Sequence, residues 1–241
     1  MRIIIEDEYD NSIILRTKRP KNDIGIYLLG SEGWLGTPAP REEPTERYQS
    51  DGDLMPRRFT QGARTVTFQV AGRFRSSMEA ADFIDKLNAL SCDTLRIIEE
   101  GPNGRRFCWG YLSDDPEPEI RESGCLVLCD LIFTCPDPLK YGDEEYFAVA
   151  NGVCNVVNRG NAPTWPEIYV KGPVTYLTVS RGDQHVSWKG STSSLHIDFS
   201  SMIPNTGKIT VDNAFQLLPG KRSIQVSTDG VAKVSLRPAW R

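Results

Sequence analysis

The sequence predicts a mostly β protein with a single helix, divided into two domains. Only one stretch, at about residues 76–91, has the apolar spacing of a helix. The last hundred or so residues contain short apolar runs divided by turn sequences such as NG, RGD and DG, which is typical of a β-sandwich. Between these regions an apolar strand ends at the two prolines of CPDPLKYG (135–142), because proline cannot continue a sheet ladder. We therefore expect an α+β domain over 1–141 and a β-sandwich over 142–241.

Composition and charge exclude several classes of protein. The chain has 241 residues, 39% of them hydrophobic and 25% charged, with a formal net charge of −4. This is ordinary globular composition, and it lacks the clustered basic residues of a nucleic-acid footprint. The apolar run in the N-terminal MRIIIEDEYD is too short for the core of a signal peptide. No run in the sequence approaches the ~20 apolar residues of a membrane span. We expect neither feature.

The first domain begins with three short apolar runs, which are spaced like strands of an antiparallel sheet. They cover residues 3–5, 13–15 and 26–29. In ARTVTFQVAGRF, apolar Val66, Phe68 and Val70 alternate with polar residues, which predicts a half-buried strand that Gly72 ends.

The helix has both a start signal and an apolar stripe. Ser76 and Glu79 have the spacing of a capping box, in which each side chain bonds to the backbone of the other end of the first turn. The stripe that would pack on a sheet consists of Ala80, Phe83, Ile84, Leu87 and Leu90.

A hairpin and a long strand complete the first domain. The hairpin has two apolar runs around GPNG, a strong turn sequence. The acidic loop SDDPEPEIRESG that follows lacks a calcium-loop pattern and is interpreted as a solvated turn. Residues 124–135 then form a strand that is apolar on both faces, which predicts a strand buried in the middle of the domain.

A long polar stretch at about residues 30–62 admits two interpretations. It is rich in glycine, proline and charge, and it is longer than most connections inside compact domains. One interpretation is a mobile surface loop. The other is an arm that becomes ordered against another chain, because Trp34, Tyr48, Leu54 and Met55 are apolar side chains that a solvated loop does not need.

The six cysteines are interpreted as reduced thiols of the core rather than as metal ligands. Cys125 and Cys129 are close in sequence, but as members of one strand they would lie roughly 13 Å apart, too far for one tetrahedral site or one disulfide. The two histidines are distant in sequence. We expect no metal and no cofactor. The six are Cys92, Cys108, Cys125, Cys129, Cys135 and Cys154.

The second domain is expected to hold nine short strands and no helix. The predicted strands are 146–150, 153–157, 167–170, 175–179, 186–188, 195–199, 208–211, 223–226 and 231–236.

In order, these features resemble the distal tail protein of siphophages, also called Dit. The shared pattern is a strand with GR before a helix, a hairpin, and a long strand that ends in Asp-Pro-x-x-Tyr. The matching boundary residues are Asp137, Pro138 and Tyr141. Further matches are NRGNAPTWPEIYVKG, LLPGKRSIQV and the C-terminal LRPAWR. The resemblance covers most of the chain.

This resemblance implies a structural virion protein at the tail tip, made in the host cytoplasm. Distal tail proteins form a homohexameric ring that joins the tail tube to the hub or baseplate and the adhesion apparatus. Their N-terminal domain resembles tail-tube subunits, and their C-terminal domain is galectin-like. The implied partners are the tail tube protein, the tail-associated hub protein, the tape measure and receptor-binding proteins, with DNA only as cargo through the lumen. In this family an extension of the first domain embraces the next subunit.

Two other functions were weighed. An enzyme is not expected, because the chain has no G-x-S-x-G, H-E-x-x-H or G-x-G-x-x-G motif and no catalytic residues can be assigned. A lectin-like adhesion module is the alternative, since the second domain resembles galectins. However, HVSWKG has His185 and Trp188 without the asparagine and arginine of the galectin sugar site. We interpret Trp165 and Trp188 as core or interface aromatics.

Overall fold

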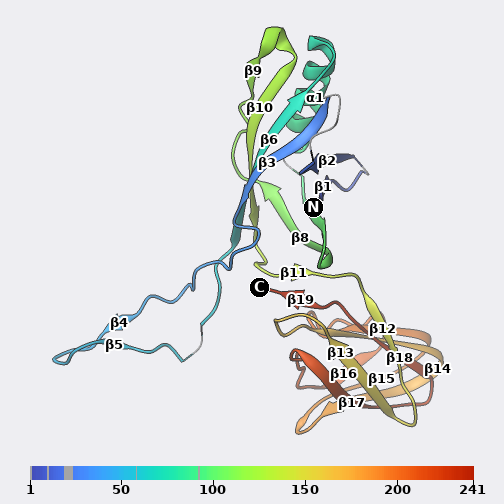
Figure 1. The fold of residues 1–241 in the computed structure, drawn as a ribbon. Helices are drawn as coiled ribbons and strands as arrows, with labels where there is room; N and C mark the ends of the chain where they lie inside the picture. The colour runs from blue at the N-terminus through green and yellow to red at the C-terminus, as the bar shows by residue number, and fades with distance from the viewer. Residues whose placement is uncertain (1, 10, 19–23, 58, 92) are drawn as a thin grey trace. The chain divides into compact units, whose positions relative to one another are not determined.

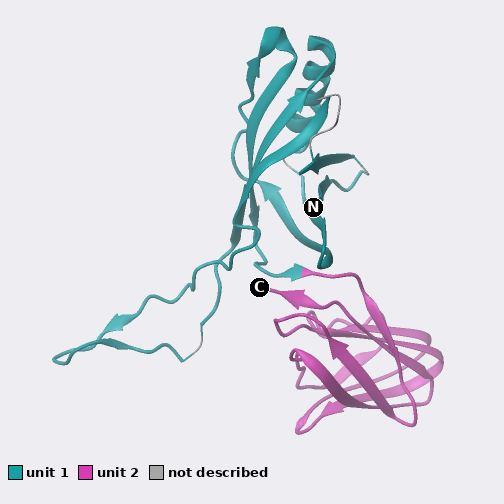
Figure 2. Cartoon of the chain, in the orientation of Figure 1, with its two compact units in different colours: residues 1–140 teal, residues 141–241 magenta. Residues whose placement is uncertain are grey.

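The computed structural model divides the chain into two compact units, residues 1–140 (unit 1) and 141–241 (unit 2), coloured separately in Figure 2. Strands dominate both units, and α1 (Ser77–Ala89) is the single α-helix of the described residues, which confirms the predicted fold class. In the described part of the chain, no helix is both long and apolar enough to cross a membrane. The structure describes residues 2–9, 11–18, 24–57, 59–91 and 93–241.

The strands of unit 1 form a sheet that closes on itself (Figure 1). The order around this barrel is β8, β7, β1, β2, β3, β6 and β10, and a short pairing of β10 with β8 closes it. The strands predicted at the N-terminus are present, but β2 and β3 pair in parallel, through Arg16 and Tyr27, rather than antiparallel as expected. The bounds are β1 (Arg2–Glu6), β2 (Ser12–Arg16), β3 (Gly25–Glu32), β4 (Thr45–Glu46), β5 (Asp53–Leu54), β6 (Arg64–Arg73), β7 (Leu95–Gly101), β8 (Gly104–Leu112), β9 (Glu119–Arg121), a 3₁₀ turn (Glu122–Gly124) and β10 (Leu126–Cys135).

The helix α1 begins as its sequence predicts. The Ser76 hydroxyl accepts a hydrogen bond from the Glu79 N–H at 3.2 Å, and the Glu79 carboxylate accepts one from the Arg75 N–H at 3.0 Å. The first bond satisfies a donor that a helix start leaves free, whereas the second lies one residue before the Ser76 N–H that a capping box would use. The predicted stripe packs into the core of unit 1, with Ile84 only partly buried. The buried members are Ala80, Phe83, Leu87 and Leu90.

The strand β10 is buried on one face only, which corrects the expectation that both of its faces lie inside the domain. The inner face packs into the core, whereas Leu126, Leu128 and Ile132 on the outer face are half-buried and Asp130 is exposed. A barrel strand has a single inside, so an apolar outer face does not place it at the centre of the domain. The buried inner residues are Val127, Cys129, Leu131, Phe133 and Cys135.

Unit 2 is all β, and two of its strands are much longer than predicted. The four runs expected at 167–170, 175–179, 186–188 and 195–199 merge into β14 and β15. A bulge near Lys171 keeps β14 continuous, so the glycine and proline that follow bend the strand without ending it. The bounds are β12 (Glu145–Ala148), β13 (Val153–Asn158), β14 (Pro166–Arg181), β15 (Gln184–Asp198), β16 (Lys208–Asp212), β17 (Gly220–Thr228), β18 (Val231–Leu236) and β19 (Ala239–Trp240); β11 (Lys140–Tyr141) crosses the boundary between the units.

The two motifs NRGNAP and RPAW meet inside unit 2. The Asn158 side-chain amide donates to the Ala162 and Leu217 carbonyls at 2.9 and 3.0 Å and accepts from the Gly160 N–H at 2.9 Å. A Cβ on Gly160 would lie 1.9 Å from the Ala239 carbonyl oxygen, so only glycine fits this close backbone approach. Both motifs therefore have a structural role in the second domain.

Candidate functional site: the arm and its buried root

Residues 37–61, hereafter the arm, leave the barrel of unit 1 as a hairpin (Figure 1). Its strands β4 and β5 pair through two residue pairs. Nearer the barrel, the Glu42 carboxylate accepts hydrogen bonds from the Thr60 N–H at 2.7 Å and the Thr60 hydroxyl at 2.5 Å. The hydroxyl bond is the main reason why the pKa of Glu42 is lowered. These local bonds align the two legs of the arm.

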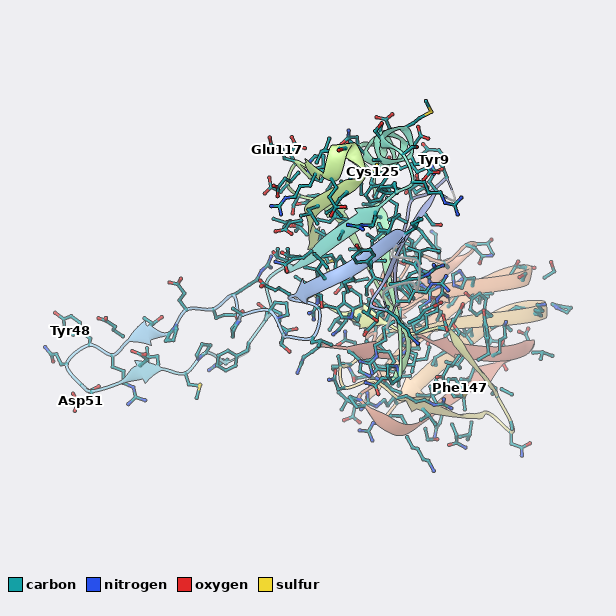
Figure 3. The ribbon with its side chains drawn as sticks, turned by 45° about the horizontal axis from the view of Figure 1, so that its top comes forward. Tyr9, Tyr48, Asp51, Glu117, Cys125 and Phe147 are labelled. Atoms are coloured by element: carbon teal, nitrogen blue, oxygen red, sulfur yellow. The ribbon has the colours of Figure 1, made fainter. Side chains whose placement is uncertain are left out.

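The apolar side chains of the arm lie in water in a single chain. Tyr48 is 92% exposed and Met55 80% exposed, and Leu54 and Phe59 are more than half exposed. Figure 3 shows Tyr48 at the far end of the arm, close to its turn. Such a group of exposed apolar residues on a projecting segment is a candidate interaction surface. Tyr48, Leu54 and Met55 are three of the four residues that the sequence offered as candidates for contact with another chain.

Trp34, the fourth, does not belong to that surface. Its side chain is 0% exposed and packs in the core of unit 1, with its ring centroid 6.3 Å from that of Phe68. Its indole N–H donates to the Glu99 carboxylate at 2.6 Å. Trp34 therefore anchors the start of the arm within its own subunit, and it is not available to a neighbour.

Arg64 binds the backbone of residues 33–36, where the arm begins. We call these residues and Arg64 together the arm root. The guanidinium is 1% exposed. Its Nη1 donates to the Gly33 carbonyl at 2.6 Å and to the Gly36 carbonyl at 2.7 Å, and its Nε donates to the Pro138 carbonyl at 2.9 Å. The planar fork of arginine carries its donors on three separate nitrogens, so that one side chain reaches acceptors that lie well apart. Arg64 thus ties both legs of the arm to the boundary segment.

The boundary residues Asp137 and Pro138 are part of this arrangement. The Asp137 carboxylate accepts the Leu139 N–H at 3.0 Å, which forms the turn that presents the Pro138 carbonyl. Tyr141, the third boundary residue, is half-buried in β11. The structure therefore brings two of the boundary residues next to the arm root, although about a hundred residues separate them in sequence.

Lys140 provides a second buried cation at the root. It is 3% exposed, and its ammonium donates to the Trp34 carbonyl at 2.7 Å. Burial lowers the pKa of Lys140 to about 8, and the charges of Arg64 and Arg106 act in the same direction, while Glu99 opposes them. Two cations and one carboxylate thus share a largely dry site.

The lowered pKa of Lys140 predicts an unusual pH dependence of stability. Its folded pKa of about 8 lies below the ordinary 10.5, so between these values the unfolded chain binds more protons and stability rises with pH. We expect the free energy of unfolding of unit 1 to gain roughly 2 kcal/mol from this group by pH 9.5. Urea unfolding at several pH values, compared with Lys140→Met, isolates the gain. A Lys86→Met control should keep it, and equal pH slopes in all three proteins would contradict the prediction.

The described cysteines are free thiols, and Cys92 lies outside the described residues. Burial raises the pKa of Cys129 and of Cys154 to about 11 in each case. The described residues contain no group of three or more metal-ligating side chains. Cys108 and Cys135 lie beside the arm root, with their sulfur atoms 3.1 Å apart.

Several aromatic residues of unit 2 contact their own neighbours, whereas Trp165 is 37% exposed. Trp188 is buried, and its indole N–H donates to the Thr206 carbonyl at 2.6 Å. On the surface, the Lys233 ammonium lies 3.9 Å from the Tyr146 ring centroid, and His196 stacks on Tyr169 at 4.4 Å. A separate groove of about 780 Å³ is lined by described residues that are neither aromatic nor charged, including Thr178 and Gln225. Trp188 is therefore a core residue, as expected from the sequence.

Neither Arg64 nor Lys140 was among the residues predicted from the sequence. The sequence did contain a signal for Arg64. Alternate residues of a strand lie on the same face, and on β6 these are Arg64, Val66, Phe68 and Val70. A charge on the inward face of a strand needs partners inside the domain. Nothing comparable in the sequence marks Lys140.

Comparison with solved structures agrees with this architecture. The SPP1 Dit (gp 19.1) protein, described as a paradigm of hub adsorption apparatus in phages that infect Gram-positive bacteria, superposes with a TM-score of 0.72 over 99% of both chains, at 14% identity. The chain has the Dit fold. Two structures of the phage p2 baseplate in its activated conformation, with Sr and with Ca, match at TM-scores of 0.54 and 0.50, each at 11% identity and over 98% of both chains.

The Dit fold spans both units and confirms, at the level of fold, the resemblance found in the sequence. The three solved structures are phage hub or baseplate proteins. No protein-family model and no curated protein sequence matches the chain. The Dit fold is thus recognised through the arrangement of strands at low sequence identity.

Proposed function

We propose that the protein is a structural, non-enzymatic component of a phage virion, which forms a ring at the distal end of a long tail. The observation that carries the proposal is a combination of two features: the Dit fold extends over the whole chain, and the arm exposes its apolar side chains to solvent. The ring joins the tail tube to the hub or baseplate and to the adhesion apparatus.

The arm supports the proposal because its exposed residues need a partner. Ordering a backbone residue costs roughly 1–2 kcal/mol, and the two residue pairs of β4 and β5 do not offset this over the length of the arm. Burial of Tyr48, Leu54, Met55 and Phe59 on a second subunit would contribute about 25 cal/mol for each Å² removed from water. We propose that each arm embraces the next subunit of the ring.

The two units have separate proposed roles. Unit 1, by its resemblance to tail-tube subunits, stacks onto the tail tube and leaves a lumen for the tape measure and for DNA as cargo. Unit 2, by its resemblance to galectins, points outward and carries receptor-binding proteins, while the tail-associated hub protein docks below the ring. These roles follow from the resemblance, and the fold supports them.

A homohexamer is the expected assembly state. A closed ring uses a head-to-tail interface with different patches on the two sides of each subunit, and an arm that reaches forward provides one such patch. Light scattering behind a sizing column should give a mass about six times the 27.0 kDa of the chain, and negative-stain images should show a ring with a central hole. A monomer, both alone and mixed with tube and hub proteins, would overturn the proposal.

A further inference from the structure

Two buried thiols meet where the barrel of unit 1 closes. Cys108 on β8 and Cys135 on β10 are at most 1% exposed, and their sulfur atoms are 3.1 Å apart. The strands approach closely here because Gly110 faces Cys135: a Cβ on Gly110 would lie 2.9 Å from the Cys135 sulfur. β8 and β10 pair through two residue pairs, and the Ser113 N–H and hydroxyl add hydrogen bonds to the Ile132 carbonyl at 2.8 and 3.1 Å, so the pairing that closes the barrel is short.

The surroundings favour thiolate chemistry over metal binding. The hydrogen bond with Cys108 lowers the pKa of Cys135, and the charge of Arg64 acts in the same direction, while burial and Asp137 oppose it. The same hydrogen bond, followed by burial, raises the pKa of Cys108. Arg64 and Lys140 would repel a metal cation, whereas they stabilise a thiolate, which is the species that attacks a disulfide.

We propose that Cys108 and Cys135 are a cross-linking site, at which oxidation forms a disulfide that joins β8 to β10 beside the arm root. The oxidant is a small-molecule disulfide, which reaches the two thiols during folding, before they are buried. The Cys135 thiolate attacks one of its sulfur atoms and releases one thiol, and the Cys108 thiolate then attacks the Cys135 sulfur and releases the second. The protein loses two protons and two electrons, and the oxidant is reduced to two thiols.

This inference departs from the expectation that all the thiols stay reduced, and it does not depend on the hub function. Cys108 and Cys135 are 27 residues apart, so a bond between them closes a long loop of the unfolded chain and restricts it. It also adds a covalent bond to the short pairing of β8 with β10 that closes the barrel. The geometry needs only about 1 Å of further approach to reach the ~2 Å length of a disulfide.

The test refolds the full-length protein from denaturant in a mixture of oxidised and reduced glutathione. Free thiols are then blocked with N-ethylmaleimide, and a digest is mapped by mass spectrometry without reduction. We expect most molecules to contain the linked Cys108–Cys135 peptide, and a Tm higher by roughly 5–10 °C than in reductant. The refolding mixture is one that oxidises structural disulfides. The proposal would be overturned if N-ethylmaleimide blocked both Cys108 and Cys135 in more than about nine-tenths of the molecules.

Two variants serve as controls. Cys154→Ser, which changes a buried cysteine of unit 2, should keep both the linked peptide and the Tm difference. Cys108→Ser should lose both. A linked peptide between any other pair of cysteines would also overturn the proposal, and this result is obtained from the unsubstituted protein even if Cys108→Ser does not fold.

Discussion

Replacing Arg64 with methionine is expected to lower the free energy of unfolding of unit 1 by about 4 kcal/mol. Methionine fills a similar space, but it leaves the Gly33, Gly36 and Pro138 carbonyls in a buried site without the donors they now have. Each such acceptor costs about 1–3 kcal/mol, and relief of the buried positive charge offsets only part of the sum. Urea unfolding, followed by tryptophan fluorescence, measures this loss of stability; unit 1 contains Trp34 and Trp109.

Two further substitutions separate this effect from a general loss of charge. Arg64→Lys should recover little of the stability, because its three donors share one nitrogen, which cannot reach carbonyls that the separate Nε and Nη1 atoms of Arg64 now bind. Arg121→Met removes an exposed arginine paired with Glu119 at 2.6 Å, and it should leave the unfolding midpoint unchanged. If Arg64→Met unfolded at the same urea concentration as Arg121→Met, Arg64 would not hold the arm root.

Shortening the arm is expected to weaken ring assembly strongly while leaving the subunit folded. Pro40 and Gln61 form a β-bridge, and the Gly62 N–H donates to the Ala39 carbonyl at 3.2 Å, so the legs are adjacent at this point. An Asn-Gly turn can therefore replace residues 41–60 as a two-residue hairpin loop. The cut spares Trp34 and Arg64, so the Tm of the subunit should stay within about 2 °C of the parent. Ring assembly should weaken at least about tenfold, as judged by light scattering on dilution.

A second variant distinguishes the side chains of the arm from its length. Tyr48→Ser, Leu54→Ser and Met55→Ser, introduced together, keep the whole arm and remove its main apolar surface. This variant should assemble as poorly as the shortened one. The outcome that would contradict the prediction concerns the shortened protein. If its rings survive the same dilution and salt as those of the parent, the arm is only a surface loop.

Local signals in the sequence were sufficient for the elements whose geometry depends on near neighbours. The cap at Ser76, the stripe of α1 and the GPNG hairpin between β7 and β8 formed as predicted, because each is specified by residues within a few positions of one another. The long strands β14 and β15 were missed for the complementary reason. Whether Gly172 ends a strand or forms a bulge depends on pairing with strands distant in the chain.

The sequence also marked the stretch at about 30–62 as a loop or an arm, through its length and its apolar Tyr48, Leu54 and Met55, and the order of its motifs pointed to the Dit fold. It assigned Trp34 wrongly and gave no place to Arg64 and Lys140. The local sequence around an apolar or cationic residue beside a glycine-rich stretch is the same whether the side chain is solvated or buried, so it does not predict the burial of that side chain. Its environment is created when β6, β8, β10 and the boundary segment close around it, which brings the Gly33, Gly36 and Pro138 carbonyls within reach of one guanidinium. Burial then makes those hydrogen bonds necessary, since water can no longer replace them.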